Sequence, residues 1–155
     1  MSTSMLPAVI DALYTTMVAA LPNAKVTDGF GVAADPTVDA LMIGVDDADN
    51  PGASATADNS QEMANAGLPR DRDETGVIQC VAFSLDGGKD PKTARDRAYA
   101  VFGAVETSLR TDPRIGLTAP ALLVAEIGSH RLLQDQFNQG AGAWVLFTVK
   151  YTARI

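Results

Sequence analysis

The stretch that decides the fold lies near the C-terminal end, where residues 143–154 read AWVLFTVKYTAR. From Val145 to Thr152, every second side chain is apolar, and the side chains between them are largely polar. These sets are Val145, Phe147, Val149 and Tyr151 on one side, and Leu146, Thr148, Lys150 and Thr152 on the other. A period of two predicts a half-buried β-strand. The fold is therefore expected to contain a long strand with one face toward a core.

Four more strands are predicted toward the N-terminus. The continuous apolar run Leu41-Met42-Ile43 is typical of a strand that is covered on both faces. A loop that contains Gly140 and Gly142 is expected to join the last two strands. The four additional strands are predicted at residues 25–30, 38–45, 76–85 and 122–133.

Two helices are predicted from apolar residues at i, i+3 and i+4 spacing. The first covers residues 6–21 and ends at Pro22, because the residue before a proline is pushed out of the helical region. The second begins at Asp90-Pro91, a capping carboxylate followed by a proline at the first helical position, and runs to about Leu109.

The predicted fold class is α+β, with the element order α-β-β-β-α-β-β. Runs of strands between only two helices favour a mainly antiparallel sheet with both helices packed against it. The 155 residues are expected to form one domain over residues 1–155, since a chain of this length can bury a sizeable core without disulfides.

Residues 46–74 are predicted to be a long, mobile, acidic loop between the second and third strands. Turn formers dominate it, and loops of this length are often functional. It holds eight acids and two bases, a balance of −6, whereas the rest of the chain holds eleven acids and ten bases. The net charge of −7 is therefore concentrated in one segment, and the remaining body is nearly neutral.

Composition argues against several classes of function. An acidic chain with no basic excess is not a general nucleic-acid binder. One histidine and one cysteine cannot build a His/Cys zinc site, and Cys80 in an apolar strand is expected to be a buried, inert thiol. The acidic run from Asp47 matches a calcium-binding loop only in part, because Pro51 occupies a ligand position.

A glycine-rich nucleotide-binding motif is also matched only in part. The segment from Gly29 to Ala34 fits a dinucleotide pattern, but Asp35-Pro36 forbids the helix that this pattern requires. No catalytic residue, metal ligand or cofactor-binding residue is therefore assigned, and no enzyme activity or cofactor is expected.

The candidate functional residues are contact residues. Arg95 and Arg97 lie in the first turns of the second helix, where the helix dipole does not favour cations, so they are expected to serve a partner or a nearby acid. His130 is expected at a strand irregularity near the surface. The full set of candidate contact residues is Asp46, Asp47, Asp49, Arg70, Arg72, Arg95, Arg97, His130, Arg131, Phe137 and Trp144.

The N-terminal segment does not resemble a signal peptide or a membrane span. No Lys or Arg precedes Lys25, Asp11 interrupts the apolar run, and the run is too short to cross a bilayer. We therefore expect a protein that is made in a reducing cytoplasm and has no membrane partner.

The chain resembles the tail terminator, or tail-completion, proteins of long-tailed phages with non-contractile tails, the lambda-like tail terminator family. The resemblance lies in the C-terminal hairpin, Val124 to Gly128 followed by Gly140 to Arg154. It also includes the opening helix, the apolar strand and acidic turn from Val38 to Asp49, and the long strand around Cys80.

This resemblance implies a structural virion protein at the tail–head junction, made in the cytoplasm of the bacterial host. It would form a homohexameric ring that caps the tail tube, ends tube polymerisation and presents the surface to which the head docks. Its partners would be other copies of itself, the tail tube protein and a head-closure or neck protein. DNA would pass through the ring without sequence-specific binding, and the 46–74 segment would be a docking element.

Two kinds of alternative stay open at this point. A head-closure or neck adaptor, or a tail tube protein, would share the assembly role. A small α+β binding domain or hydrolase belongs to another class of function.

Overall fold

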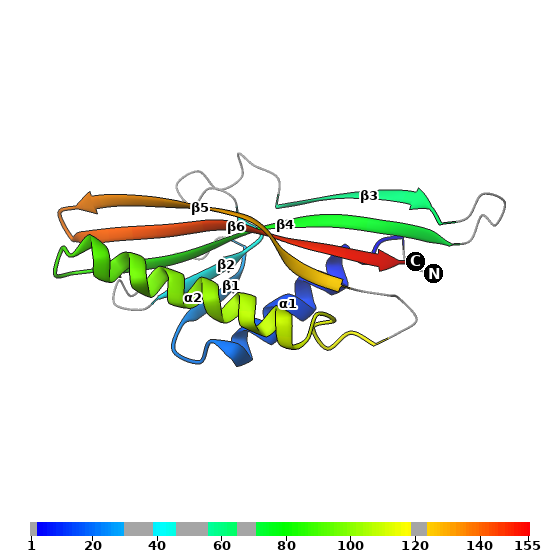
Figure 1. Ribbon diagram of the computed structural model, residues 1–155, viewed down its shortest axis with the longest axis horizontal. Helices are drawn as coiled ribbons and strands as arrows, with labels where there is room; N and C mark the ends of the chain where they lie inside the picture. Colours follow the sequence, from blue (N-terminus) through cyan, green and yellow to red (C-terminus); the bar gives the residue numbers. More distant parts are fainter. Residues whose placement is uncertain (1–2, 30–38, 46–55, 65–70, 119–123) are drawn as a thin grey trace.

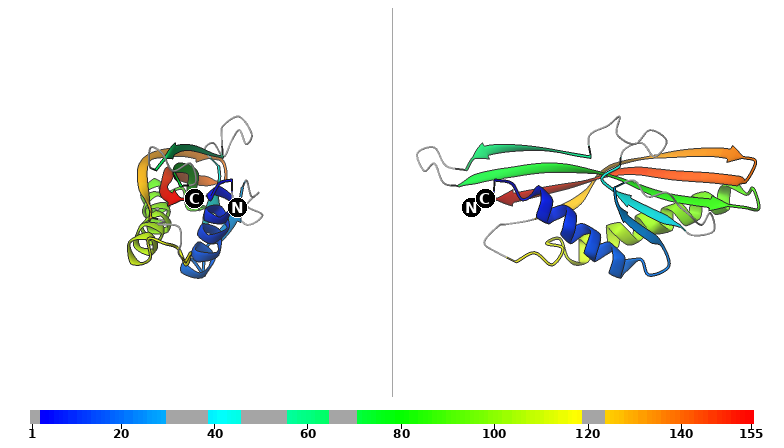
Figure 2. Two further views of the ribbon diagram at one scale, coloured as in Figure 1. Left: turned by 90° about the vertical axis from the view of Figure 1, so that its right-hand side faces the viewer. Right: turned by 180° about the vertical axis from the view of Figure 1, so that it is seen from behind.

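A mixed β-sheet with two helices on one of its faces forms the body of the molecule (Figures 1 and 2). The computed structural model describes residues 3–29, 39–45, 56–64, 71–118 and 124–155. The helices are α1 (Leu6–Ala20) and α2 (Pro91–Thr111). The strands are β1 (Lys25–Asp28), β2 (Ala40–Ile43), β3 (Ala57–Met63), β4 (Arg72–Asp86), β5 (Val124–Phe137) and β6 (Gly140–Arg154).

The sheet is six-stranded, in the order β1-β2-β4-β6-β5, and β3 pairs with β4 beyond the end of β2. Only β1 and β2 run parallel, and the other pairs are antiparallel. The predicted α+β class is confirmed, and the predicted elements appear in the expected order.

One strand lies where the sequence predicts a loop. Within residues 46–74, β3 pairs with β4 from Ala57 opposite Ile78 to Met63 opposite Arg72, and β4 itself begins at Arg72. The prediction of a loop is therefore wrong for residues 57–63 and 72–74, while residues 46–55 and 65–70 lie outside the described residues. The sequence of β3 is almost entirely polar, so it lacks the alternation of apolar and polar residues that predicts a half-buried strand. It is a strand because its backbone pairs with β4.

The loop predicted around Gly140 and Gly142 is also wrong. β6 begins at Gly140, and Gly142 pairs with Asp135 and with Leu85 inside the sheet. Only Asn138 and Gln139 form the turn between β5 and β6. Glycine is required at residue 140 because its φ is 147° and an added Cβ would collide with the backbone of Asp86.

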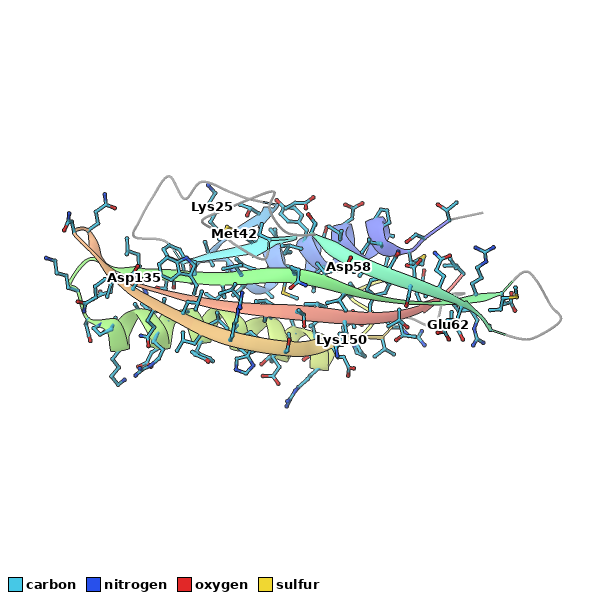
Figure 3. All side chains as sticks on the ribbon, turned by 90° about the horizontal axis from the view of Figure 1, so that it is seen from above. Lys25, Met42, Asp58, Glu62, Asp135 and Lys150 are labelled. Carbon is cyan, nitrogen blue, oxygen red and sulfur yellow. The ribbon has the colours of Figure 1, made fainter. Side chains whose placement is uncertain are left out.

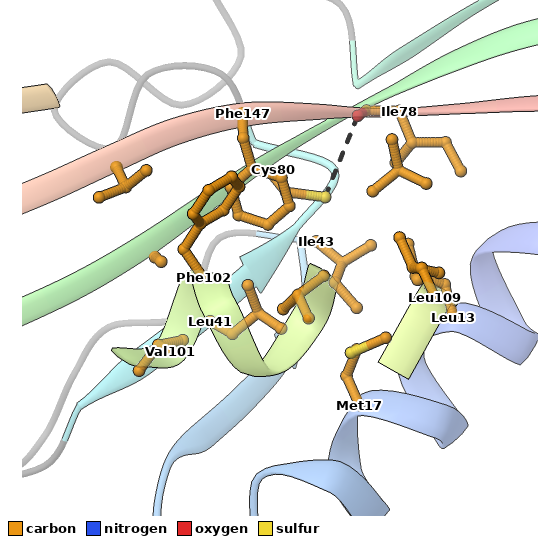
Figure 4. Packing of buried hydrophobic residues seen from close by; sticks show 14 of the residues in the cluster. Leu13, Met17, Leu41, Ile43, Ile78, Cys80, Val101, Phe102, Leu109 and Phe147 are labelled. Carbon is orange, nitrogen blue, oxygen red and sulfur yellow. Dashed lines mark hydrogen bonds between the residues drawn. The ribbon is translucent and has the colours of Figure 1, made fainter. Parts of the chain in front are cut away.

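The main core lies between the helices and the sheet (Figure 4). α1 contributes Val9, Leu13 and Met17, which recur every four residues and are almost completely buried. α2 begins as predicted, since Asp90 Oδ1 accepts a hydrogen bond from the Lys92 N–H at 3.2 Å and Pro91 is the first helical residue. Cys80 is buried in this core, and burial raises the pKa of its thiol to about 12.

A fully buried carboxylate joins α1 to the sheet. Glu74 Oε1 accepts hydrogen bonds from the Tyr151 hydroxyl (2.7 Å), the Ser4 hydroxyl (3.0 Å) and the Met5 N–H (3.0 Å). Its Oε2 accepts one from Gln61 Nε2 at 2.7 Å. We call these five residues the Glu74 cluster. It connects the start of α1 with β3, β4 and β6, so the polar strand β3 is held by a buried charge as well as by its backbone.

Gly76 gives Tyr151 the space that this cluster requires. Gly76 and Tyr151 are directly opposite each other on β4 and β6, and a Cβ at residue 76 would collide with the tyrosine ring. The ring therefore lies over the glycine and its hydroxyl reaches Glu74, two residues earlier on the same face of β4.

We predict that Gly76→Ala lowers the free energy of unfolding by about 1–3 kcal/mol, the usual cost of overpacking. Gly103→Ala is the matched control, because a Cβ at this position in α2 meets nothing within 4 Å and alanine favours a helix. The control should raise stability by roughly 0.5–1 kcal/mol. Urea denaturation followed by circular dichroism measures both, and equal effects would contradict the role of Gly76.

A second prediction concerns pH. Burial alone raises the pKa of Glu74, but the hydrogen bonds from Tyr151, Ser4, Gln61 and Met5 outweigh it and lower the pKa below the ordinary value of 4.5. A lowered pKa stabilises the fold above about pH 4.5, and this contribution is lost as the pH falls through the folded-state pKa.

Glu74→Gln should therefore cost about 2–3 kcal/mol at pH 7, and the difference from wild type should shrink between pH 5 and about pH 3. Glu62→Gln, on an exposed residue of β3, is the control. Urea denaturation midpoints across this pH range measure the difference in stability between wild type and Glu74→Gln. A difference that stays constant with pH would contradict a buried, charged Glu74.

Candidate assembly surface

The sheet has a second face, which points away from both helices (Figure 3). The strand registers place two rows of side chains across this face. The first row is Ala40, Phe83, Trp144 and Leu133, and the second is Met42, Val81, Leu146 and Arg131. Six of these side chains are large and apolar, and we call them the outer-face patch: Met42, Val81, Phe83, Leu133, Trp144 and Leu146.

The outer-face patch is partly exposed. Met42, Val81 and Leu146 are buried, Phe83 and Trp144 are half-buried, and Leu133 is 50% exposed. The rings of Phe83 and Trp144 pack with centroids 5.2 Å apart. Aromatic side chains beside an exposed leucine and Arg131 have the composition that protein interfaces favour.

The far end of this face is polar and charged. Asp58 and Glu62 on β3 share it with Lys150 and with Asp73 and Arg154, which face each other on β4 and β6. Arg154 donates two hydrogen bonds to Asp73, at 2.8 and 3.2 Å, and these lower the pKa of that carboxyl. The outer face therefore has an apolar half near the β5–β6 turn and a charged half near β3.

A β-bulge in β5 lies just before His130. The register of β5 on β6 shifts between Ile127 and His130, and the Ser129 N–H donates to Thr148 Oγ1 at 3.0 Å. His130 lies on the helix side, with its ring 4.9 Å from that of Phe102, whereas Arg131 lies on the outer face. The expected irregularity at His130 is thus present, and the two neighbouring candidates face opposite sides.

Arg97 is engaged within the chain. Its guanidinium lies 2.8 Å from Asp39 Oδ1, and it donates a hydrogen bond to the Leu85 carbonyl at 3.3 Å. The buried Ser84 hydroxyl donates to the same Asp39 oxygen at 2.7 Å. Arg97 therefore serves a nearby acid and ties α2 to β4 and to the residue before β2, while Arg95 is half-buried on α2.

The other candidates are scattered. Arg72 begins β4, where it donates to Gln61 Oε1 at 3.4 Å and pairs through its backbone with Ile155. Phe137 ends β5 opposite Gly140. Asp46, Asp47, Asp49 and Arg70 lie outside the described residues. Of the predicted contact residues, the structure brings Arg131 and Trp144 together on one face.

Sequence reasoning did not select Phe83, Leu133 or Glu74 as important. Phe83 and Leu133 come from separate strands, and only the strand registers show that both lie beside Trp144. Glu74 is one acid among the eight of the predicted loop, and its burial depends on Tyr151, 77 residues away.

Other kinds of site receive no support among the described residues. These residues contain no group of three or more His, Cys, Asp or Glu that could hold a metal ion. None of the helices that the structure describes is long and apolar enough to span a membrane.

Comparison with known proteins gives a likeness of fold. No protein-family model and no curated protein matches the sequence. A chain of the solved structure described as the virion of a native gene transfer agent (GTA) particle is similar, with a TM-score of 0.55 and 12% sequence identity. The match covers 99% of this chain and 100% of that chain, so the whole α+β architecture is shared.

The Arg97 contacts generate a prediction. Arg97→Ala should lower the free energy of unfolding by about 1 kcal/mol, because the half-exposed ion pair is lost while the Asp39 carboxylate keeps its hydrogen bond from Ser84. Arg95→Ala is the matched control and should change stability by less than about 0.5 kcal/mol. Chemical denaturation measures both, and loss of self-association by Arg97→Ala at unchanged stability would instead make Arg97 a contact residue.

Proposed function

We propose that this chain is a structural protein of a phage-like virion and, within that class, a tail terminator. It forms a homohexameric ring that caps the tail tube, ends tube polymerisation and presents the surface on which the head docks. DNA passes through its bore without sequence-specific binding. The ring is assembled from protein made in the host cytoplasm and is located at the tail–head junction.

The observation that carries this proposal is the fold likeness to a chain of the gene transfer agent virion. It extends over 99% of this chain and 100% of the other, so the likeness takes in the full length of both chains. The independent resemblance of the C-terminal hairpin and long strands to tail terminators narrows the proposal from a virion protein to the tail end.

The open edges of the sheet support assembly into a ring. The outer edge of β5 has one backbone hydrogen bond to another described segment, from the Ala125 N–H to the Pro113 carbonyl at 2.8 Å. β3 pairs only with β4 within the described part of the chain. Unpaired edges promote association unless they are covered, and neighbouring copies in a ring can cover them.

The strand directions also suit a closed ring. β3, β4, β6 and β5 alternate in direction, so β3 and β5 at the two edges run in opposite directions. Copies related by rotation could therefore place β5 of one copy beside β3 of the next in an antiparallel arrangement. Such a contact is heterologous, and heterologous contacts close into rings when the rotation permits.

The charge of the chain suits a conduit for DNA. A net charge of −7 repels phosphates, so DNA can move past the protein without being held. Specific contacts would then be with proteins, and we assign Arg131 and Trp144 in the outer-face patch to contact with the tube or neck protein.

The test combines the purified chain with tail tube protein from the same phage during polymerisation. We expect rings in negative-stain images, a ring at one tube end and shorter tubes as the ratio of this chain to tube protein rises. Incorporation along the tube would indicate a tube protein, and binding to heads alone would indicate a neck adaptor. Either result would contradict the terminator role.

A patch variant sharpens the same test. Leu133→Asp places a charge in the outer-face patch and should weaken tube capping by about tenfold or more. Gln136→Asp, an exposed position on the opposite face of β5, is the matched control. Equal capping by both variants would remove the patch from the contact.

A further inference from the structure

The outward face of α1 is unusually poor in charge. Its exposed residues include Pro7, Asp11, Tyr14 and Val18, which follow i, i+4, i+7 and i+11 spacing and form one stripe opposite the buried face of the helix. We call them the α1 stripe. Tyr14 is 37% exposed and Val18 is 46% exposed.

The contrast with α2 shows how unusual this surface is. Asp11 is the only Asp, Glu, Lys or Arg among the 15 residues of α1, whereas α2 has six such residues among 21. A helix on a solvent-facing surface normally has charged or polar residues on its outer side. Depletion of charge together with an exposed tyrosine is the pattern of a protein contact.

A groove lies on the opposite flank of the molecule. It has a volume of about 300 Å³ and runs between the end of α2 and the start of β5. Leu109, Pro113, Val124 and Ile127 provide its apolar lining, and Val124 is 44% exposed. Among the described residues that line it, the charged ones are Arg110, Glu106 and Glu126.

We propose that the α1 stripe of one copy docks in the α2–β5 groove of a second copy. This rests on the proposed ring and names the contact between neighbouring copies. α1 packs on β1 at one edge of the sheet and the groove borders β5 at the other, so the two surfaces face opposite ways (Figure 2). Surfaces on opposite flanks form a heterologous contact, which a ring requires.

The position of α1 agrees with pairing of the sheet edges. The residues before α1 are bound to β3, through Asn59 Nδ2 to Ser4 Oγ at 3.0 Å and Gln61 Nε2 to the Thr3 carbonyl at 2.8 Å. The α1 stripe therefore lies on the same flank as the β3 edge, as the groove lies on the flank of the β5 edge. One rotation can bring both pairs of surfaces together.

Charge favours the α1 stripe as one side of this contact. Two copies with a net charge of −7 repel each other, and the stripe holds a single acid, whereas the groove holds Glu106 and Glu126 beside Arg110. The single acid of α1, Asp11, can meet Arg110, which is highly exposed and already bound to Glu106 on α2 at 2.6 Å. Val18 and Tyr14 would then lie against the apolar lining.

Disulfide cross-linking tests the contact in the full-length protein. Val18→Cys and Val124→Cys in one chain should give, on oxidation, a ladder of covalent oligomers that ends at the ring, since the natural Cys80 is buried. Neither single variant should cross-link. Dimers of the Val18→Cys single variant would show that the stripe meets itself, and absence of a ladder from intact rings would also overturn the proposal.

Charge changes give a second readout. Val18→Glu should raise the concentration at which rings dissociate by about tenfold or more, while Ala19→Glu, the exposed neighbour off the stripe, should not. Asp11→Arg and Arg110→Asp should each weaken rings, and the double variant should recover them.

The controls separate the two proposals. Wild-type rings that tolerate Val18→Glu would overturn this contact and leave the terminator role standing. A wild-type chain that stays monomeric, alone and with tube protein, would overturn both.

Discussion

The fold depends on a carboxylate without direct access to water. Glu74 lies on the helix side of the sheet, where an unpaired charge would cost several kcal/mol, and four hydrogen bonds make its burial possible. Their donors come from the residues at the start of α1 and from β3 and β6. Because these elements converge on one charged group, loss of the carboxylate would remove a hydrogen-bond acceptor from Tyr151, Ser4 and Gln61 together. The position of α1 on the sheet is therefore fixed by electrostatics as well as by its apolar face.

This constraint explains how a polar strand belongs to the sheet. β3 offers little apolar surface, and its outer side has no strand partner in the described part of the chain. Its backbone pairs with β4, and Gln61 fastens its middle to Glu74. The result is a sheet that ends in an open, polar edge at β3 and an open, longer edge at β5. A ring built by pairing of sheet edges needs two such edges on each molecule. The hydrogen bond from Gln61 to Glu74 holds β3, which forms one of these edges.

Much of the fold could be predicted because it has local signals. The period of two in β6, the periodic stripe of α1 and the Asp90-Pro91 start of α2 each depend on neighbouring residues. β3 could not be predicted, since a strand such as Ala57–Met63 is stabilised by pairing partners 9 to 21 residues later. The candidate surface was found in part: Arg131 and Trp144 were selected, but Phe83 and Leu133 join them only through strand registers that no local pattern reveals.

Strand pairing also changes where the negative charge of segment 46–74 lies. The segment 46–74 holds eight acids, yet Glu74 is buried, Asp73 is paired with Arg154, and Asp58 and Glu62 lie on a strand. Part of the apparent acidic loop is thus structural sheet, and its exposed charge lies along the β3 half of the outer face. Copies of an acidic protein that meet side by side must keep such surfaces apart or neutralise them. An almost uncharged helix face on the same flank lets neighbours approach there, which is why the charge distribution favours α1 as the place of contact.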